Sequence, residues 1–360
     1  MDDADDNYYS LFPIHDPLFP IHYSLSTIPY PLFPIHYPLS PMKKFSVTKQ
    51  RKWWWLLSSA TILAGIVSMI LSWTNPEIGS PLRRGLDFTG GSKLQYELDC
   101  TIANNCQPID IATVREIVKN QGIIDPIIQV VGKDSTGLSI RTKDLKVDAR
   151  TKLESALSEK IGKFDPKKTQ NDTVGPTLGE ELFKNGLIAI GLSFGLILLY
   201  LTFRFKFDYA FFAFVALFHD VFITTGIFSI LGLVGGVEID SLFVVAILTI
   251  IGFSVNDTVV IYDRIREVIS LHPDQPIDKI VDDAVNQTMS RSINTTLTVL
   301  LTLLSIFLFG GDTLKNFALC LIIGFTAGAY SSIFIASTLF GWWRKNHPVT
   351  PPPAIVTSES

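Results

Sequence analysis

The fold class of this chain follows from residues 254–267, SVNDTVVIYDRIRE, and from the apolar run before them. No charged side chain occurs from 241 to 253, and residues 240–262 reach the roughly 20 residues that a helix needs to cross a bilayer. We therefore predict a membrane helix over 240–262. At about 1.5 Å per residue, Asp257 lies inside the bilayer, in the third of the helix nearest Asp263 and Arg264.

Asp257 is the first candidate functional residue. A carboxylate inside the membrane is costly unless it is paired, hydrated or protonated, so an intramembrane acid is a functional-site hypothesis by default. The alternative is structural: Asn256 and Asp257 would form a buried polar joint between helices. This stretch alone leaves both interpretations open.

The composition indicates a polytopic membrane protein that carries one soluble insertion. Of the 360 residues, 47% are hydrophobic and 18% are charged, and the charges cluster in blocks. No broad basic region suggests nucleic acid, and the three cysteines lack the spacing of a zinc site. We expect no nucleic-acid partner, no metal and no cofactor.

Residues 1–41 form a low-complexity tail rich in proline, which blocks both helix and ladder hydrogen bonds. The pattern LFPIH occurs in it three times, at 11–15, 18–22 and 32–36. We expect this tail to be disordered. The spacing of its histidines is by itself no metal signal; they are His15, His22 and His36.

Six apolar runs have the length of membrane spans. The first follows a basic segment, is too long for a cleaved signal peptide and has Trp at both ends, where aromatic rings favour the interface. We expect spans at 53–73, 182–203, 209–231, 240–262, 293–309 and 317–340. The chain then divides into the tail, a basic segment with the first span (42–74), a soluble domain (75–180), a five-helix membrane domain (181–345) and a short tail (346–360).

Lys and Arg are distributed unevenly between the connecting segments. One set of segments carries Arg204, Lys206, Arg264, Arg266, Lys279, Arg344 and Lys345, whereas the opposite set carries Glu238, Asp240 and Asp312 with Lys315. The positive-inside rule then places both termini and the loop 263–292 in the cytoplasm. The soluble domain faces the trans side of the membrane.

The soluble segment 75–180 has the pattern of a small α+β domain. Strands are expected at 94–98, 127–131, 137–141 and from 173, with helices at 110–120, capped by Asp110, and 148–161. This β-α-β-β-α-β order is ferredoxin-like, which fixes no function. No nucleophile and base stand together in it, so we expect no enzyme. Cys100 and Cys106 either form a disulfide outside the cytosol or stay free thiols.

Ionisable side chains at membrane depth form a small constellation. His219 and Asp220 lie in the middle of the third span, and Arg291 stands just ahead of the fifth. Short loops and alternating direction bring Arg291 to the depth of Asp257. A nearby Arg favours the carboxylate while desolvation favours the neutral acid, and this opposition suits a proton carrier. A fixed ion pair, or a His–Asp hydrogen bond without further role, is the alternative.

Four motifs in this order resemble the SecD/SecF family of protein translocase subunits. They are RGLDFTGG at 84–91, HD at 219–220, NDT through DRIRE at 256–267, and SRSINT at 290–295. The DFTGG form resembles the SecF branch rather than the SecD branch, and the likeness covers about 43–345. The remaining motif residues are Gly85, Asp87, Phe88, Gly90, Gly91, Asp263, Arg264 and Arg266.

The resemblance implies membership of the resistance-nodulation-division superfamily and a location in the cell inner membrane or an internal energy-coupling membrane. It implies a complex with SecD beside the SecYEG channel, where the pair uses the proton gradient to draw preproteins out. On this basis the intramembrane acid is Asp257 and its charge partner Arg291. Asn256, His219 and Asp220 are further candidates for proton coupling.

Two other functions remain as alternatives. One is a small-molecule exporter of the same superfamily, although such chains are usually longer and carry two large soluble insertions. The other is a structural subunit that assembles the channel, with the buried charges serving only as joints.

Overall fold

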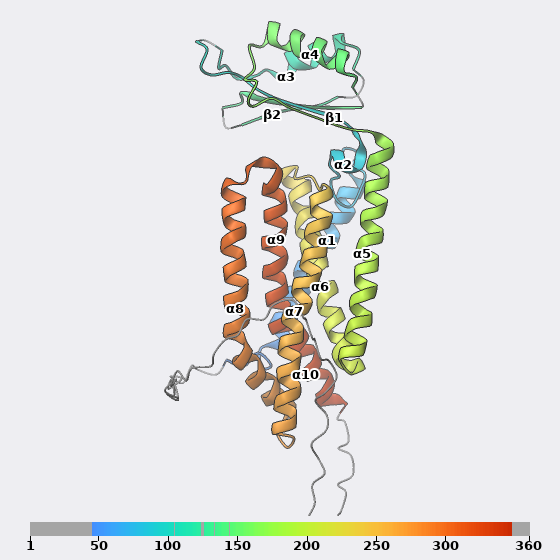
Figure 1. Cartoon of the computed structure of the whole chain (residues 1–360), viewed down its shortest axis with the longest axis vertical. Helices are drawn as coiled ribbons and strands as arrows, with labels where there is room; N and C mark the ends of the chain where they lie inside the picture. Colours follow the sequence, from blue (N-terminus) through green and yellow to red (C-terminus); the bar gives the residue numbers. More distant parts are fainter. Residues whose placement is uncertain (1–44, 104, 124–125, 133, 144, 348–360) are drawn as a thin grey trace, which may run out of the picture. The chain divides into compact units, whose positions relative to one another are not determined.

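The computed structural model describes residues 45–347 except 104, 124, 125, 133 and 144. Predictions for the proline-rich tail and for residues 348–360 lie outside this part. Within it, six helices are long and apolar enough to cross a membrane, one ahead of a four-stranded sheet and five after it (Figure 1). The expected polytopic architecture, one plus five helices with a small ferredoxin-like domain, is confirmed.

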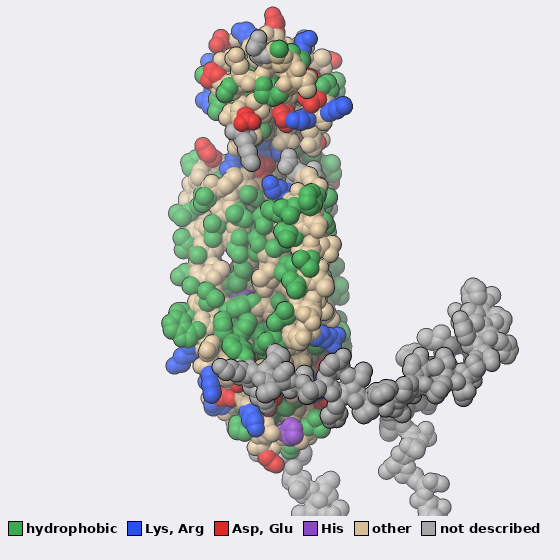
Figure 2. All heavy atoms as spheres, turned by 90° about the vertical axis from the view of Figure 1, so that its left-hand side faces the viewer, with side chains coloured by type: hydrophobic (Ala, Val, Ile, Leu, Met, Phe, Trp, Pro, Cys, Tyr) green, Lys and Arg blue, Asp and Glu red, His purple; other side chains and the backbone are tan. Residues whose placement is uncertain are grey.

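The spans begin with α1 (Arg51–Thr74), and the other five follow the sheet. Hydrophobic side chains cover the middle of the helices on the face seen in Figure 2, and Lys and Arg gather toward the ends. This distribution suits a bilayer. The second to fifth spans are α5 (Pro176–Arg204), α6 (Phe207–Gly235), α7 (Ser241–Leu271) and α8 (Ile277–Phe309). The sixth span is formed by α9 (Gly311–Ser331), the π-helical segment η1 (Ser332–Ala336) and α10 (Ser337–Asn346).

The segment 263–292 differs from the expected loop, because most of it is helical. Helix α7 continues to Leu271 and α8 begins at Ile277. Ile265 and Val268 are buried at helical spacing on α7, as are Val281 and Val285 on α8. Burial of these apolar residues keeps both segments helical beyond the predicted spans and leaves only a short turn between them.

The sheet domain has the predicted order of elements. Its strands are arranged β2-β3-β1-β4, every neighbouring pair is antiparallel, and both longer helices cover one face (Figure 1). This is the ferredoxin-like arrangement. The elements are α2 (Leu86–Thr89), β1 (Gly91–Glu97), α3 (Ile111–Asn120), β2 (Ile127–Val131), β3 (Gly137–Thr142), α4 (Val147–Lys160) and β4 (Gln170–Val174).

Asp110 caps α3 as expected. Its carboxylate accepts hydrogen bonds from the backbone N–H groups of Ala112 at 3.2 Å and Thr113 at 3.0 Å. The Thr113 hydroxyl and these amides hold the pKa of Asp110 below its usual value. The cap orients α3 so that Val114 and Val118 reach the core of the domain, where both are fully buried.

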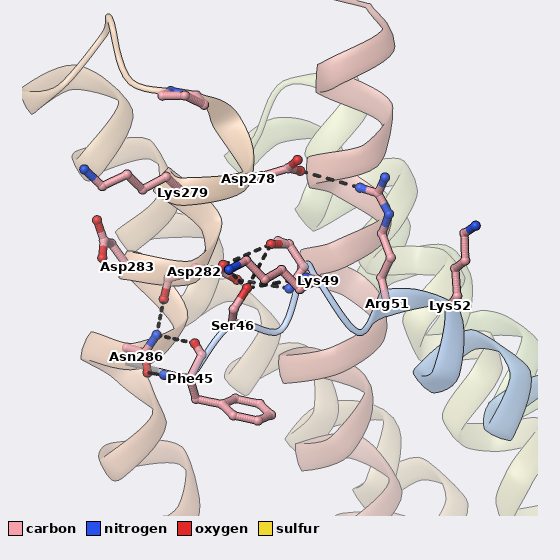
Figure 3. Close-up of a pocket in the computed structure, with 12 residues that line it drawn as sticks. Phe45, Ser46, Lys49, Arg51, Lys52, Asp278, Lys279, Asp282, Asp283 and Asn286 are labelled. Carbon is pink, nitrogen blue, oxygen red and sulfur yellow. Dashed lines mark hydrogen bonds and ion pairs between the residues drawn. The ribbon is translucent and has the colours of Figure 1, made fainter. Parts of the chain in front are cut away.

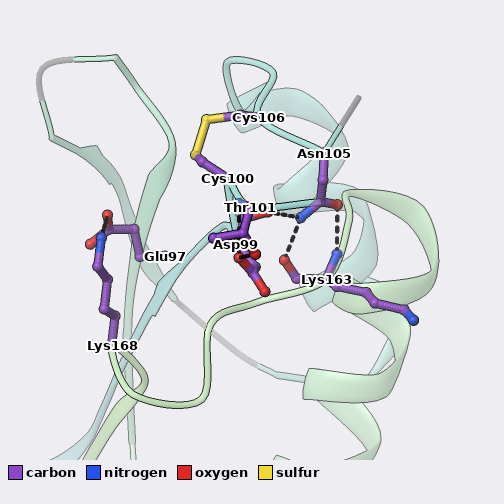
Figure 4. Close-up of a disulfide and its surroundings, with 8 residues drawn as sticks. All are labelled: Glu97, Asp99, Cys100, Thr101, Asn105, Cys106, Lys163 and Lys168. Carbon is purple, nitrogen blue, oxygen red and sulfur yellow. Dashed lines mark hydrogen bonds and ion pairs between the residues drawn. A yellow bond between two sulfur atoms is a disulfide. The ribbon is translucent and has the colours of Figure 1, made fainter. Parts of the chain in front are cut away.

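Cys100 and Cys106 form a disulfide across a loop beside β1 (Figure 4). The Asn105 side chain fixes the same loop, since it donates to the carbonyls of Asp99 at 3.0 Å and Lys163 at 2.7 Å and accepts from the Lys163 N–H at 2.9 Å. Because the closed loop is short, its entropy limits the stabilisation to about 2–3 kcal/mol. The disulfide is therefore a local staple.

Two neighbouring glycines make the joint between the sheet and the membrane helices. Gly90 and Gly91 have φ angles of +65° and +112°, where a side chain is strained. A Cβ on Gly91 would lie 2.4 Å from the Thr142 carbonyl oxygen, and one on Gly90 would lie 2.6 Å from the Cα of Pro176, the first residue of α5. The pair lets the start of β1, the end of β3 and the start of α5 meet.

Small residues also set the distance between membrane helices. A Cβ on Gly65 of α1 would lie 2.7 Å from the Gly226 Cα of α6, and one on Gly324 of α9 would lie 2.1 Å from the Ile250 Cδ1 of α7. Gly324 and Gly328 of α9, four residues apart, therefore allow close packing against α7. The same spacing on α5, at 191 and 195, meets nothing within 4 Å in the described chain.

The joint predicts a large difference between two glycine substitutions. Gly91→Ala should lower the free energy of unfolding of the sheet domain by about 2–3 kcal/mol, because backbone strain is joined by a clash with Thr142. Gly122→Ala is the matched control, since Gly122 also has a positive φ (+74°) but open space around it. Urea unfolding followed by hydrogen exchange in β1 measures both, and equal losses would contradict the steric argument.

Candidate functional site

Asp257 lies on the buried face of α7 and is only 5% exposed. Its Oδ2 atom is buried and has no hydrogen-bond partner in the described structure. A buried carboxylate oxygen without a donor is costly as a charge and much less costly once the group is protonated. The Asp257 side chain could therefore gain a proton on Oδ2 without breaking a hydrogen bond seen in the described structure.

Arg291 lies at the same level as Asp257 but is not bonded to it. The two residues stand 17 positions either side of Asp274, in the turn between the antiparallel helices α7 and α8. Arg291 interacts electrostatically with Asp257, but no ion pair joins the two among the described side chains. Arg291 and Asn256 are both exposed. Asp257 and Arg291 therefore lie at a similar depth, as expected, but the described structure shows no ion pair between them.

Two hydroxyls on α8 share the condition of Asp257. Ser292 Oγ and Thr296 Oγ1 are buried and have no hydrogen-bond partner in the part of the chain described. They lie one turn apart on the inward face of α8, and Ser292 follows Arg291 directly. Polar atoms without protein partners suit transient water. Sequence reasoning missed both, although Ser292 lies inside the motif SRSINT and Thr296 follows it directly.

Asp220 presents the opposite case, because both of its oxygens are occupied. Oδ2 accepts hydrogen bonds from Ser254 Oγ of α7 at 2.5 Å and from Ser331 Oγ of α9 at 2.8 Å, while Oδ1 lies 2.9 Å from His219 Nδ1. The side chain is fully buried. Asp220 therefore binds α6, α7 and α9 together. The other ring nitrogen of His219, Nε2, is buried with no partner found among the described residues.

A polar seam continues from this cluster along α7. Thr258 Oγ1 lies 2.8 Å from Ser332 Oγ, and the Tyr262 hydroxyl donates to the Ala336 carbonyl at 3.1 Å. Ser332 and Ala336 are the ends of the π-helical segment η1. Such segments often occur at functional sites. This seam is hard to predict from sequence, since single hydroxyls in an apolar span are usually bonded to their own helix.

The family-motif residues at the far end of α7 form interhelical contacts. Asp263 pairs with Arg204 of α5 at 2.7 Å and with Arg266 one turn along at 3.5 Å. Arg264 donates through Nε to the Gln287 side chain of α8 at 2.5 Å. Asp263 and Arg264 thus connect α7 to α5 and α8, whereas the ion pair of Arg266 lies within α7.

The segment before α1 is fastened to the start of α8 (Figure 3). Asp282 accepts from Ser46 Oγ at 2.6 Å and from the Thr48 N–H at 3.0 Å, and Asn286 exchanges two hydrogen bonds with the Phe45 backbone. Arg51, the first residue of α1, lies 3.5 Å from Asp278. These contacts tie the first span to the helix that carries Arg291.

The glycine motif connects the sheet domain to the start of α7. Asp87 accepts from the Ser241 N–H at 3.0 Å and from its hydroxyl at 2.5 Å, and the Gly85 N–H donates to the Ile239 carbonyl at 2.7 Å. Phe88 packs edge-on against Phe183 of α5, with ring centroids 5.4 Å apart. The helix that holds Asp257 thus begins on a motif of the sheet domain.

The family follows from these motifs and from comparison with known proteins. A family model for the protein export membrane protein SecD/SecF, C-terminal region, matches residues 153–346, and a second, for the SecD/SecF GG motif, matches 78–102. The chain belongs to the SecF branch of the SecD/SecF family. The second match contains the glycine joint described above.

Two curated relatives show how far the likeness extends. The chain is 54% identical over 315 residues to the protein translocase subunit SecF of Synechocystis sp., covering 87% of this chain and 99% of that one. It is 36% identical over 311 residues to the SecF of Prochlorococcus marinus, covering 84% and 96%. Both relatives are therefore matched over almost their full length.

A solved structure has the same fold. The crystal structure of SecDF, a translocon-associated membrane protein from Thermus thermophilus, superposes with a TM-score of 0.68 at 30% identity. The match covers 84% of this chain but only 39% of the SecDF chain. Most of the SecDF chain therefore has no counterpart here.

The two buried acids predict opposite effects on stability. Asp220→Asn should lower the free energy of unfolding by about 2–4 kcal/mol, because one of the two buried oxygens bonded to Ser254, Ser331 and His219 becomes an amide N–H₂ that cannot accept. Asp257→Asn should change it by less than about 1 kcal/mol, since that carboxylate has no bonded partner to lose. Denaturant titration of the purified protein in detergent measures both; a larger loss at Asp257 would contradict the assignment.

Proposed function

We propose that this chain is an accessory, non-enzymatic subunit of the Sec preprotein translocase that couples the proton gradient to protein export. Family membership supports the translocase role, because the relatives are named protein translocase subunits. The observation that carries the proton coupling is the buried, unpartnered carboxylate oxygen of Asp257 inside a membrane helix. An intramembrane acid with these properties suits a proton relay.

The coupling step is a change of partner at Asp257. Protonation removes the charge and lets the group stay buried without a donor, as its open position in the structure allows. Release of the proton leaves a carboxylate that attracts Arg291, which is exposed at the same level on α8. Each proton passage would thus draw α7 and α8 together and release them, with Ser292 and Thr296 as hydration sites along the way.

The sheet domain would respond because α7 begins on it. Asp87 holds the first residue of α7 through two hydrogen bonds, and Arg141 of β3 pairs with Glu238, just ahead of α7, at 2.6 Å. A shift of α7 would therefore be transmitted to residues 75–180. We assign this domain to the trans side, where it would touch the emerging preprotein beside the SecYEG channel.

SecD is the partner that this assignment requires. Asn256 of α7 and Asn294 of α8 are exposed on membrane helices, as is Arg291, and neither amide has a hydrogen bond within the described chain. Such groups are costly against lipid and are normally covered by protein. The crystallised relative is named SecDF, and most of its chain is unmatched here. A SecD subunit on this face would shield the polar groups and complete the proton path.

The orientation follows from the charges at the two ends of the helices. Arg204, Arg264 and Arg266 lie at one end, and Glu238 with Asp240 at the other. We place the end that carries the arginines on the cytoplasmic side of the cell inner membrane. Both termini, with residues 42–52 and 346–360, lie on the same side.

A labelling experiment tests this orientation. A cysteine at Asp134, exposed in the sheet domain, should react with an impermeant thiol reagent added from the trans side, and one at Asp274, in the turn between α7 and α8, should not. Background should be low, because Cys100 and Cys106 are bonded to each other and Cys320 is buried. The reverse pattern would overturn the proposed role of the sheet domain.

Substitution of Asp257 tests the proton coupling. Asp257→Asn keeps the shape of the side chain but cannot titrate, so gradient-dependent stimulation of preprotein translocation into vesicles should fall to the level measured without a gradient. Protein amount and SecD association should stay near normal. Asp257→Glu should retain part of the activity, because it titrates from a displaced position. Full stimulation by Asp257→Asn would eliminate the carrier role.

The double variant separates this proposal from a purely structural joint. If Asp257 and Arg291 only form a buried ion pair, each single substitution should impair assembly, and Asp257→Asn with Arg291→Gln should restore both assembly and activity. If Asp257 carries protons, the double variant should assemble and remain inactive. An exporter of small molecules would leave preprotein translocation unchanged in every variant.

A further inference from the structure

An apolar cavity opens between the membrane helices at the end next to the sheet domain. Its volume is about 430 Å³, within the range of small-molecule sites of about 300–1,000 Å³. Phe183 and Leu187 of α5, Val221 of α6 and Val244 of α7 are among the side chains that line it. It is separate from Asp257, which does not line it.

The cavity offers almost no polar contact to water. The hydroxyls of its two lining alcohols are already used, since Ser80 donates to the Leu82 carbonyl and Thr225 to the Val221 carbonyl, each at 2.7 Å. Water in a cavity needs several polar partners, so these walls suit a hydrocarbon. The lining residue Leu187 is 55% exposed on a membrane helix, so bilayer lipid can reach the cavity.

Arg84 supplies the exception to this apolar lining. Its guanidinium carbon lies over the Phe183 ring, 5.3 Å from the ring centroid, a contact that uses none of its N–H donors in a hydrogen bond. Nearby carboxylates serve other arginines, since Glu238 lies 2.6 Å from Arg141 and 4.0 Å from Arg83. In the described structure, no acid and no hydrogen-bond acceptor pairs with the Arg84 side chain.

We propose that this cavity binds an anionic phospholipid of the leaflet next to the sheet domain, with one acyl chain in the cavity and the phosphate on Arg84. The guanidinium fork of an arginine matches the geometry of a phosphate. Arg84 forms a backbone bridge with Ile239, two residues before α7 begins, so it lies at the depth of a lipid headgroup. Acyl chains gain nothing by leaving one apolar environment for another. Selectivity therefore resides in the Arg84 contact and in the shape of the cavity.

A lipid bound at this site would contact the segment that joins the sheet domain to the membrane helices. Arg84 begins the RGLDFTGG motif, and the same motif holds the start of α7 through Asp87. The cavity is also the place where α5 packs loosely beside α6 and α7, and a bound chain would fill that space.

Native mass spectrometry of the full-length protein in mild detergent tests the proposal, with phosphatidylglycerol and phosphatidylcholine as probes. We expect one phosphatidylglycerol to be retained per chain, more tightly than phosphatidylcholine. Arg84→Gln should weaken phosphatidylglycerol retention by about tenfold or more and abolish the preference. Leu187→Trp, which narrows the cavity without touching Arg84, should weaken retention of both lipids.

Matched controls separate a built site from lipid that coats any membrane protein. Lys315→Gln removes a cation that also lies over an aromatic ring, that of Phe307, outside the cavity, and Leu192→Trp enlarges a similarly exposed leucine of α5 that does not line it. Both should retain phosphatidylglycerol as the unsubstituted chain does. Equal retention in all four variants, or equal loss in all four, would overturn the proposal.

Two further results keep the test decisive. The melting temperature of each variant identifies one that fails to fold. If Arg84→Gln fails to fold, Leu187→Trp decides the test instead, because Leu187 is at an exposed position. A photo-crosslinker at Leu187 should capture lipid in membranes. Capture of a translocating polypeptide there, with no retained phospholipid, would assign the cavity to the exported chain and overturn the lipid site.

Discussion

The carboxylate of Asp220 is shared by three membrane helices, and the packing of the bundle depends on it. Ser254 and Ser331 both donate to Oδ2, and no water in the hydrocarbon could replace them. Gly328 allows this approach, because a Cβ there would lie 3.2 Å from Ser254 Cβ and 3.6 Å from Asp220 Oδ2. From this point the hydroxyl contacts of the seam continue along α7 to Ala336. The polar groups thus fix which faces of α6, α7 and α9 meet, while apolar packing alone would allow them to slide.

Helix α7 carries this fixed arrangement from one end of the bundle to the other. Its 31 residues extend about 45 Å, from the Ser241 contact with Asp87 to the Asp263 contact with Arg204 and beyond. The sheet domain, the Asp220 cluster and the ion pairs at the far end are therefore contacts of one rigid element. A displacement of α7 as a whole would therefore change all of these contacts together.

Local sequence patterns predicted the elements well and the contacts between them poorly. Apolar runs located the six spans, period-two and period-3.6 patterns located the sheet domain, and Asp110 was recognised as a cap because its donors are two and three residues away. Ser254 and Ser331 could not be paired with Asp220, since the partners are 34 and 111 residues distant. The segment 263–292 reads as a loop in sequence because charged residues are interspersed among the apolar ones that the structure buries, such as Ile265 and Val281.

The spacing of Ser254 and Asp257 lets one helix carry both a residue fixed to the acid Asp220 and an acid, Asp257, that has no hydrogen bond to Oδ2 in the described structure. The two residues are three positions apart on α7, so their Cα atoms differ by about 4.5 Å along the axis. Because Ser254 is bound to Asp220, the Asp257 side chain stays at one depth relative to α6. Its own Oδ2 is left without a donor, so no bond need break before a proton arrives. In the proposed function, the charge of Asp257 would change first, and its attraction to Arg291 would then move α7 and α8 relative to each other.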